Sequence, residues 1–405
     1  MNGINHKRIA GKSLHYLSEP VRKFWQPQEL LEDASNFPDI FWPGENSSPD
    51  YIQKYPDWKE YIMIPCNDTL VNCHSAFDSL KIWETYPVVL NFLVHRALDA
   101  MDSGDQELAV KIAGVLSHII GDTGQAAHVF DSMQLSLLFQ GDEDIYLIHS
   151  LIENNPMVSY PDHPYTARCL GDNVDEFLWR LLQELVKLKK RSTRTIVPIM
   201  TATLKDDLDT AAQYASATVG ECADLFADVL YTLTLIHLRE KKGPDAMSLL
   251  QLEPERWHCD GMFNFLPQKN YIPGPTRRTP LPLHIGNGPQ LGIALLPDMF
   301  PGCTGGRCAF VEYPLPPGVF QKFTFSCGLN RAADRNETAG IFEIRLDDKT
   351  VWESPALDIH SPSVSAEVNL GRAERLQLLV KDARRDTAET KFFYPCFIEP
   401  VLWRN

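Results

Sequence analysis

The stretch HIIGDTGQAAH, His118 to His128, brings three potential metal ligands into one short segment that otherwise has the character of a helix. His118 and Asp122 are four residues apart and therefore share one face of a helix. His128 is six residues beyond Asp122, which on a straight helix turns it about 120° away. The three side chains can converge only if the helix bends or restarts, and the glycines at 121 and 124 permit such a break.

The spacing of a histidine and an acidic residue four positions apart recurs in the chain. It occurs at His15/Glu19, His74/Asp78, His95/Asp99, His118/Asp122 and His149/Glu153. With 53 acidic residues among 405 and 12 histidines, chance predicts roughly 1.6 such pairs. Imidazole and carboxylate without thiolate is a donor set suited to zinc in hydrolytic sites. The spacing alone leaves both a metal site and ordinary solvated helix contacts open, and we favour the latter for His15 and His95.

Residue patterns divide the chain into a helical part and a strand-rich part. Residues 85–104, 105–122, 172–191 and 195–240 carry apolar residues at helical spacing, with acids at several helix starts, and shorter helices are expected at 6–19 and 27–34. Prolines and glycines then become frequent, and beyond residue 300 segments such as IFEIRLDD alternate with period two. We predict a helical domain over 1–242, a Pro/Gly-rich linker over 243–282 and an all-β sandwich over 283–405.

Composition excludes several classes of protein. The net charge of -15 argues against a broad electrostatic grip on nucleic acid or acidic lipid. No apolar run reaches the length of a membrane-spanning helix, and no basic-then-apolar leader begins the chain. The nine cysteines form no close CxxC pair, which argues against a zinc ribbon, although Cys66 with Cys73, or Cys303 with Cys308, could pair in an exported protein. Oligomeric state is not predicted.

The order of these motifs resembles the zinc-dependent phospholipase C family and the related single-strand nucleases. His118, Asp122 and His128 match the family's central His-x3-Asp-x5-His pattern, and His149 and Glu153 match its later His-x3-Glu/Asp pattern. An early histidine, an aspartate after the second helix and a following histidine are matched by His6, Asp39 and His74. The stretch FPDIFWP also resembles the amino-terminal domain of glycosylphosphatidylinositol-specific phospholipase D. The resemblance covers about residues 1–240.

The resemblance implies three metal positions in the helical domain, of which we expect two to hold zinc and the third to be optional. The first position would use Asp39, His74, His118 and Asp122, and the second His128, His149 and Glu153. The third would use His6, Asp122 as a bridge, and the backbone amino and carbonyl groups of Met1, where the family has a tryptophan. The chain also departs from the family at residues 125–127, where a proline often precedes the third ligand.

The function that the resemblance implies is zinc-dependent hydrolysis of a phosphoric diester, of phospholipase C type. A hydroxide held between metal ions would attack phosphorus, and Asp39 would orient the water or accept its proton. The substrate would be a phospholipid head group or another phosphodiester, in contact with Phe37, Phe41, Trp42 and Phe77 unless these pack in the core. The alternatives are a single-strand nuclease, and a glycan-binding protein whose metal site is structural or vestigial. Met1, if native, predicts a cytoplasmic protein, whereas the family is usually exported.

The C-terminal part resembles the carbohydrate-binding modules that accompany some glycosidases. The strands FQKFTFSCGLN, GIFEIRLDDKTVWESPAL and AERLQLLVKDA carry this resemblance. It implies a possible glycan partner. Trp352, Tyr394 and Trp403 are candidates to stack on sugar rings, with burial inside the sandwich as the alternative for each.

Overall fold

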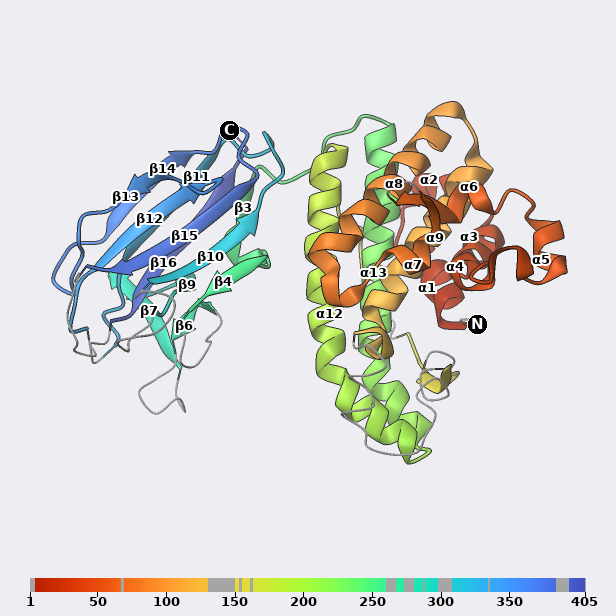
Figure 1. The fold of residues 1–405 in the computed structure, drawn as a ribbon, viewed down its shortest axis with the longest axis horizontal. Helices are drawn as coiled ribbons and strands as arrows, with labels where there is room; N and C mark the ends of the chain where they lie inside the picture. The colour runs from red at the N-terminus through yellow and green to blue at the C-terminus, as the bar shows by residue number, and fades with distance from the viewer. Residues whose placement is uncertain are drawn as a thin grey trace. The chain divides into compact units, whose positions relative to one another are not determined.

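The computed structural model describes residues 4–66, 69–129, 150–152, 155–160, 163–259, 267–272, 280–286, 288–297, 308–333, 336–383 and 393–404. The chain divides into two compact units, Met1–Gly243 and Pro244–Asn405. We call them the helical unit and the β unit (Figure 1). The predicted fold class, a helical N-terminal part followed by a β-sandwich, is confirmed.

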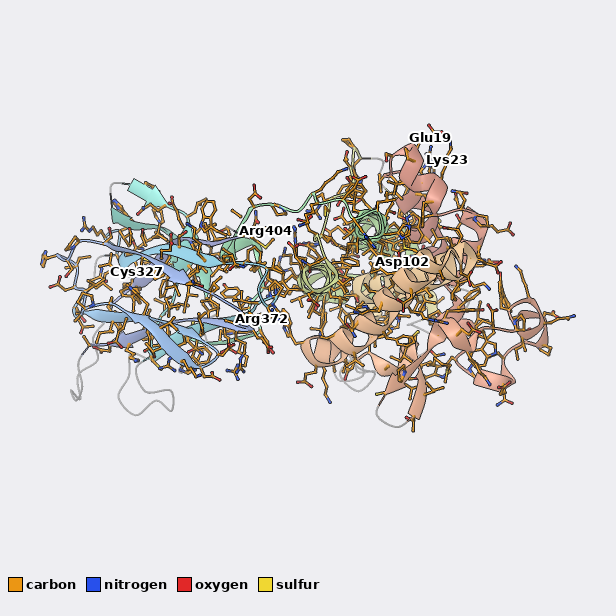
Figure 2. The ribbon with its side chains drawn as sticks, turned by 90° about the horizontal axis from the view of Figure 1, so that it is seen from above. Glu19, Lys23, Asp102, Cys327, Arg372 and Arg404 are labelled. Atoms are coloured by element: carbon orange, nitrogen blue, oxygen red, sulfur yellow. The ribbon has the colours of Figure 1, made fainter. Side chains whose placement is uncertain are left out.

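The helical unit begins with short elements that surround its longer helices. These are α1 (Ile4–Leu14), α2 (Glu19–Phe24), α3 (Gln28–Ala34), α4 (Phe37–Ile40), α5 (Pro49–Lys54), α6 (Lys59–Ile62), β1 (Met63–Cys66), β2 (Thr69–Asn72) and α7 (Cys73–Ala76). The expected helix over 6–19 is shorter in the structure, because the chain turns after Leu14 and restarts as α2. An ion pair of 2.7 Å between Glu19 and Lys23 lies along α2 (Figure 2).

Four long helices follow among the described residues, and three of them begin with a side-chain cap. They are α8 (Ile82–Ser103), α9 (Gln106–Gly124), α12 (Val174–Leu204) and α13 (Leu208–His237). The side chains of Asp105, Asn173 and Asp207 each accept a hydrogen bond from a backbone N–H in the first turn of α9, α12 and α13. The expected break between 191 and 195 is absent, and the chain breaks instead after Leu204, where Asp206 adopts φ 57°.

Helix α9 is the centre of the helical unit. Every residue from Ala109 to Gly124 is buried, and the helix contacts α1, α3, α8, α12 and α13 (Figure 1). Close packing depends on small residues, because a Cβ built on Gly114 would lie 2.5 Å from the Ala34 Cβ and one on Gly124 only 2.1 Å from the Cys222 Sγ. Polar side chains on α9 are therefore held in the interior, where the neighbouring helices fix their directions. Within the described residues, no helix has both the length and the apolar character required to cross a membrane.

The β unit is a sandwich of two antiparallel sheets. One sheet has the order β13 (Lys349–Glu353), β12 (Gly340–Leu346), β15 (Arg375–Asp382), β10 (Cys308–Pro314), β4 (Arg256–His258). The other has the order β14 (Val364–Asn369), β11 (Lys322–Leu329), β16 (Pro395–Trp403), β9 (Gly292–Ala294), β5 (Gln268–Lys269). Phe342 of the first sheet packs edge-on against Phe397 of the second at 5.3 Å, and Cys327 is buried on β11 (Figure 2). The two inner faces thus form one apolar core.

The segment expected to be a linker, residues 243–282, differs from that expectation. It contains β3 (Ala246–Ser248), β4, β5 and β6 (Tyr271–Ile272). β3 pairs with β16, and β4 pairs with β10. β6 pairs with β7 (Leu281–Gly286), which pairs with β8 (Gly288–Gln290). Strands of two or three residues are too short to show an alternating pattern. The frequent prolines and glycines between them were therefore the only signal in this segment, and they indicated a linker.

Candidate metal centre

Six of the nine predicted metal ligands lie together in the helical unit. They are His6 on α1, Asp39 on α4, His74 on α7, His118 and Asp122 on α9, and His128 in the 3-10 turn Ala126–His128. The other three, Met1, His149 and Glu153, lie outside the described residues. The six residues come from five separate segments, so packing of the helical unit, and not local spacing, brings them together.

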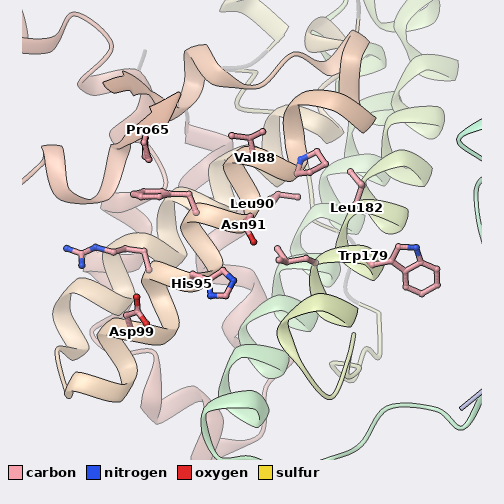
Figure 3. A pocket seen from close by; sticks show the side chains of 12 residues that line it. Pro65, Val88, Leu90, Asn91, His95, Asp99, Trp179 and Leu182 are labelled. Carbon is pink, nitrogen blue, oxygen red and sulfur yellow. The ribbon is translucent and has the colours of Figure 1, made fainter. Parts of the chain in front are cut away.

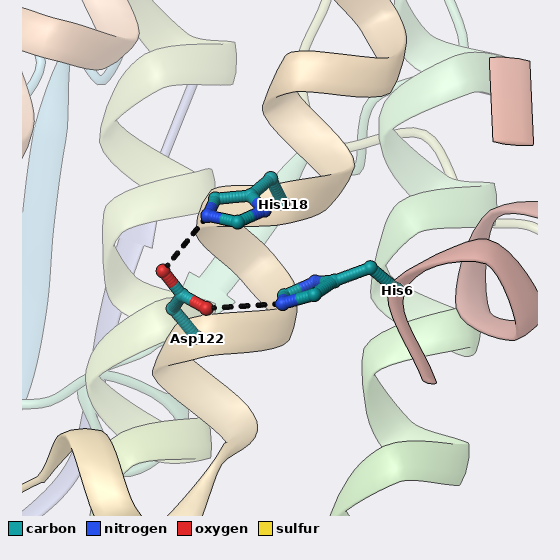
Figure 4. Close-up of side chains that lie close together, drawn as sticks. All are labelled: His6, His118 and Asp122. Atoms are coloured by element: carbon teal, nitrogen blue, oxygen red, sulfur yellow. Dashed lines mark ion pairs between the residues drawn. The ribbon is translucent and has the colours of Figure 1, made fainter. Parts of the chain in front are cut away.

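The Asp122 carboxylate is the point on which the histidines converge. Its Oδ2 is 3.2 Å from the His118 Nε2 and 3.6 Å from the His74 Nε2. Its Oδ1 is 3.3 Å from the His6 Nε2 and 3.6 Å from the His128 Nε2. Figure 4 shows His6 and His118 approaching the two different oxygens. Each oxygen of Asp122 therefore faces its own pair of imidazoles.

Asp39 completes one side of this arrangement. Its Oδ1 is 3.5 Å from the His74 Nε2 and 3.8 Å from the His118 Nε2. Asp39, His74, His118 and the Oδ2 of Asp122 form one candidate position, which we call position A. His6 and the Oδ1 of Asp122 form the second, position B, and the ligand atoms of His6, His118 and Asp122 lie within 4.8 Å of one another. The expected group of His128, His149 and Glu153 stays a prediction, because His149 and Glu153 lie outside the described residues.

The spacing of these atoms fits metal ligands better than hydrogen bonds. Zinc bonds of about 2.0–2.1 Å in a tetrahedral arrangement separate the donor atoms by about 3.3–3.5 Å. The observed N···O separations run from 3.2 to 3.8 Å. Within the described part of the chain, both Asp122 oxygens and the His118 Nε2 are buried without a hydrogen bond. Buried polar atoms left in this way require a compensating partner, and a divalent cation supplies one for all three.

The break after α9 explains how His128 reaches the cluster. Helix α9 ends at Gly124, and Gln125 is extended with φ -85° and ψ 123°. The chain then turns through Ala126–His128 as a single 3-10 turn. The extended Gln125 redirects the backbone toward the cluster. The predicted bend between Asp122 and His128 is present in the structure.

A backbone carbonyl fixes the protonation of His118. The His118 Nδ1 is 2.8 Å from the Ser35 carbonyl oxygen. A carbonyl oxygen only accepts, so Nδ1 carries a proton and donates, which leaves Nε2 as the nitrogen that faces Asp122 and would bind a metal after losing its own proton. A histidine held in this way presents one ligand atom to one ion. Positions A and B adjoin at Asp122, whose two oxygens face different imidazoles.

Asn72 links the two residues that form the outer part of position A. Its side-chain Oδ1 accepts from the His74 backbone N–H at 2.9 Å, and its Nδ2 donates to the Pro38 carbonyl at 3.2 Å. Pro38 directly precedes Asp39. Sequence reasoning missed both Asn72 and Ser35. An asparagine two residues before a histidine is a helix-capping pattern that could have been noticed, but a backbone acceptor carries no sequence signature.

Burial and charge shift the pKa values of the cluster. Burial would raise the pKa of the Asp122 carboxyl, but the His118 and His128 imidazoles hold it well below its usual range. Burial would lower the pKa of His118, but the Asp122 and Asp39 carboxylates raise it to about 9. Burial lowers the pKa of His74. The Asp122 carboxylate is thus held in the ionised form that binds metal.

The aromatic residues beside Asp39 and His74 divide into core and surface. Phe37 and Phe41 are fully buried, and Phe41 stacks on Trp58 at 5.1 Å, so both belong to the core. Trp42 is 53% exposed, and its ring meets the His74 ring edge-on at 4.7 Å. Phe77 is partly buried, 5.7 Å from His74. Of the four candidates, Trp42 is the most exposed.

The aromatic candidates of the β unit are partly buried. Trp352 packs edge-on against Phe325 at 5.0 Å, and Trp403 donates from Nε1 to the Thr324 Oγ1 at 2.8 Å. Tyr394 packs against a small apolar cluster. All three are of intermediate exposure and contact neighbouring side chains, so the structure favours packing for each.

A separate cavity of about 750 Å³ lies between α8 and α12, also in the helical unit. Its lining includes Val88, Phe92, His95, Trp179 and Leu182 (Figure 3). None of the six clustered ligands lines it. His95 with Asp99, one of the pairs at the helical spacing, therefore lies at this cavity and not at the metal centre.

Comparisons with known proteins found one family model and several similar solved structures. Residues 308–393 match the family model of the NPCBM/NEW2 domain. Similar solved structures include a CBM51 module from Clostridium perfringens GH95 in complex with methyl-galactose, at 16% identity, covering 39% of this chain and 99% of that one, with a TM-score of 0.28. Alpha toxin from Clostridium absonum matches at 12% identity over 99% of this chain and 94% of that one, with a TM-score of 0.37.

A further similar structure holds the M60 catalytic domain with two CBM51 domains from Clostridium perfringens ZmpB, at 16% identity and a TM-score of 0.29. That match covers 39% of this chain and spans 15% of the other. No match was found among curated proteins.

Proposed function

We propose that the helical unit is a zinc-dependent phosphoric diester hydrolase of phospholipase C type. The observation that carries the proposal is the convergence of four imidazoles on the two oxygens of one buried carboxylate, Asp122. A structural zinc site needs four ligands in one closed set. Two adjoining sets that share Asp122 fit a pair of ions, which is the arrangement that phosphoester hydrolysis uses.

Residues already in the cluster would hold two ions. Asp39, His74, His118 and the Oδ2 of Asp122 would hold the first, and His6 with the Oδ1 of Asp122 the second. By the family pattern, His149 and Glu153 would complete the ligands of His128, and the backbone of Met1 would complete those of His6. When bound, zinc would supply a water of lowered pKa as the nucleophile and positive charge for the phosphate oxygens.

Side chains and one backbone carbonyl of the cluster would orient the reacting groups and keep bulk water out. Asp39 would orient the attacking water and accept its proton, because it lies beside His74 and His118 at the more accessible side of the cluster. The Ser35 carbonyl would keep the His118 lone pair directed inward. Burial of His118 and Asp122 would exclude bulk water from the inner part of the centre.

Charge supports a phosphate ligand at this position. Two zinc ions with the carboxylates of Asp39 and Asp122 leave a local charge of about +2. The chain as a whole carries -15. Phosphate oxygens would therefore be attracted to the centre and repelled by the remaining surface.

A single-strand nuclease is the alternative that a specific observation favours. The exposed indole of Trp42 lies against His74 and could stack on an unpaired base. For the β unit we propose glycan binding, supported by the match to the NPCBM/NEW2 domain.

One set of measurements tests the proposal. The purified chain should bind at least two zinc ions and release phosphocholine from phosphatidylcholine faster than it cleaves single-stranded DNA. His74→Ala should lower zinc content and activity, whereas His95→Ala, which removes a histidine of the same sequence spacing outside the cluster, should change neither. A chain without bound zinc and without turnover on either substrate would leave only the glycan-binding alternative.

A further inference from the structure

The segment of the chain that precedes α12 is held along α13 although it has no regular structure. Residues 155–160 and 163–171 contain no helix or strand, and we call them the strap. From residue 163 to residue 169 the odd-numbered side chains are the less exposed ones. This alternation is typical of an extended chain that lies against a surface. The proposed function assigns no role to any residue of the strap.

One buried carboxylate on α13 holds the strap. Asp228 is fully buried, and it accepts a hydrogen bond from the Tyr165 hydroxyl at 2.8 Å and from the Arg168 backbone N–H at 2.6 Å. The Arg168 Nη2 donates to the same carboxylate at 2.7 Å. One turn further along α13, the Thr232 hydroxyl accepts from the Leu170 backbone N–H at 2.9 Å. Because a buried carboxylate requires such donors, Asp228 specifies where the strap lies.

The strap also contacts α1, the helix that carries His6. The Tyr160 hydroxyl donates to the Asn5 backbone carbonyl at 3.0 Å, and Asn5 directly precedes His6. The Arg8 guanidinium lies over the Tyr160 ring, 4.7 Å from its centroid. Tyr160 is therefore fixed against the first turn of α1, at the residue next to a candidate ligand.

A second tyrosine connects the anchor on α13 with α1. The Tyr165 hydroxyl donates to Asp228, while its ring meets the Tyr16 ring edge-on at 5.4 Å. Tyr16 lies just beyond the end of α1. The strap thus contacts α1 at its first turn and again just past its last.

His6 depends on the placement of its own backbone more than His118 does. A ligating histidine is usually oriented by a hydrogen bond from its second ring nitrogen, and the His118 Nδ1 has such a partner in the Ser35 carbonyl. Among the described residues, the His6 Nδ1 is buried without a hydrogen bond. The His6 Nε2 nevertheless lies 3.3 Å from the Asp122 Oδ1. The position of α1 must therefore set this approach.

We propose that Tyr160 is a positioning residue for position B, because it holds the first turn of α1 where His6 meets Asp122, and that docking of the strap on Asp228 supports it. The inference rests on the proposed function and adds the segment that sets the affinity for the second ion. Coupling of this kind is reciprocal. An ion bound at His6 must stabilise the docked strap by the same factor by which the strap strengthens binding of that ion.

Zinc titration of the full chain tests the role of Tyr160. Tyr160→Phe removes the hydroxyl that bonds to Asn5, and it should weaken binding of one of the two zinc ions by about 2–10-fold, the usual effect of one such hydrogen bond. The affinity for the other ion should not change, whereas a merely structural role would lower both affinities. Tyr214→Phe is the matched control, because Tyr214 is on α13 and 46% exposed. It should bind both ions as the original chain does.

Amide hydrogen exchange tests the reciprocal effect. The Arg168 and Leu170 amides bond to side chains of α13, so their exchange reports release of the strap. Zinc should slow their exchange by about 2–10-fold in the original chain, and the effect should be smaller in Tyr160→Phe. The amide of Val380, on β15 of the β unit, is the internal control and should not respond to zinc.

The outcomes separate failure of this inference from failure of the proposed function. Equal zinc affinities in the original chain and Tyr160→Phe would overturn the inference, and so would exchange of the strap amides that is independent of zinc. Binding of two ions with the expected coupling, in a chain that hydrolyses neither phosphatidylcholine nor single-stranded DNA, would instead reject the proposed hydrolase and leave the inference standing. A chain that binds fewer than two zinc ions would overturn both.

Discussion

The imidazole of His6 lies directly over Gly121. A Cβ built on Gly121 would stand 2.6 Å from the His6 Nδ1 and 2.9 Å from its Cε1. The same imidazole stacks on the His118 ring with centroids 4.2 Å apart. Gly121 lies in the turn of α9 between His118 and Asp122. Because it has no side chain, the His6 ring on α1 has room to approach the Asp122 Oδ1.

Gly121→Ala is therefore expected to displace His6 while leaving position A in place. Both atoms that a Cβ would meet inside 3.0 Å belong to the His6 ring, so the ring itself has to move. The variant should lose about one zinc ion per chain in equilibrium dialysis, as His6→Ala should. Gly286→Ala is a suitable control, since its nearest neighbour would be an ordinary contact at 3.7 Å. Full zinc content in Gly121→Ala would show that position B does not use His6.

Asn72→Asp is expected to weaken position A specifically. Aspartate can still accept from the His74 N–H, but it cannot donate to the Pro38 carbonyl, so the connection between the segments of Asp39 and His74 is lost. Loss of such supporting hydrogen bonds typically lowers metal affinity by about 10–100-fold. Zinc competition with a chromogenic chelator would measure this. The zinc affinity of Asn72→Leu should be at least as low as that of Asn72→Asp. Unchanged zinc affinity in both variants would exclude Asn72 as a positioning residue.

Removal of metal should destabilise the helical unit and leave the β unit unaffected. An ion that binds only the folded state stabilises it by about 2.7 kcal/mol when its free concentration is 100 times the Kd. Thermal unfolding followed by circular dichroism, with zinc or with a chelator, should show a shift in the helical transition. The strand-dominated transition serves as the internal control. An unmoved helical transition would mean that the buried cluster does not bind zinc.

The acid stability of the β unit should depend on Glu343. This side chain is buried on β12 and accepts hydrogen bonds from Arg345 and Thr350, with Lys381 as an ion-pair partner. Burial would raise its pKa, but these partners lower it from 4.5 to about 2. Because the folded pKa lies below the unfolded one, the stabilisation is complete above pH 4.5 and is lost as the pH falls towards 2. The contribution of Glu343 to the free energy of unfolding amounts to about 3 kcal/mol at most.

Glu343→Gln should therefore unfold at lower urea concentration at pH 7 and should lose less of its remaining stability between pH 4.5 and pH 2. Glu353→Gln is the matched control, because Glu353 is on the neighbouring strand, more than half exposed, and 3.8 Å from Lys381. Its unfolding free energy should change by less than about 0.5 kcal/mol. Identical pH profiles of stability for the original chain and Glu343→Gln would show that Glu343 does not contribute to unfolding in acid.

The sequence by itself determined the local structure. Helical periodicity predicted the long helices, alternation predicted the strands of the sandwich, and the interval from His118 to Asp122 placed both residues on one helix face. It also predicted that the helix must break before His128, which the structure shows at Gly124 and Gln125. These features follow from short stretches of backbone geometry, which depend on neighbours in the chain. The very short strands within 243–282 were missed, because two or three residues display no period.

Only the tertiary structure decided how remote groups meet. It brought His6, Asp39 and His74 to α9, and it divided the histidines between the two oxygens of Asp122. It buried Phe41 and exposed Trp42, two adjacent residues of similar apolar character. It also selected the carbonyl of Ser35 as the partner of His118. Every residue has a backbone carbonyl, and any aromatic side chain can be buried or exposed. Which carbonyl bonds to His118 and which aromatic side chain is exposed therefore depend on how the helices pack.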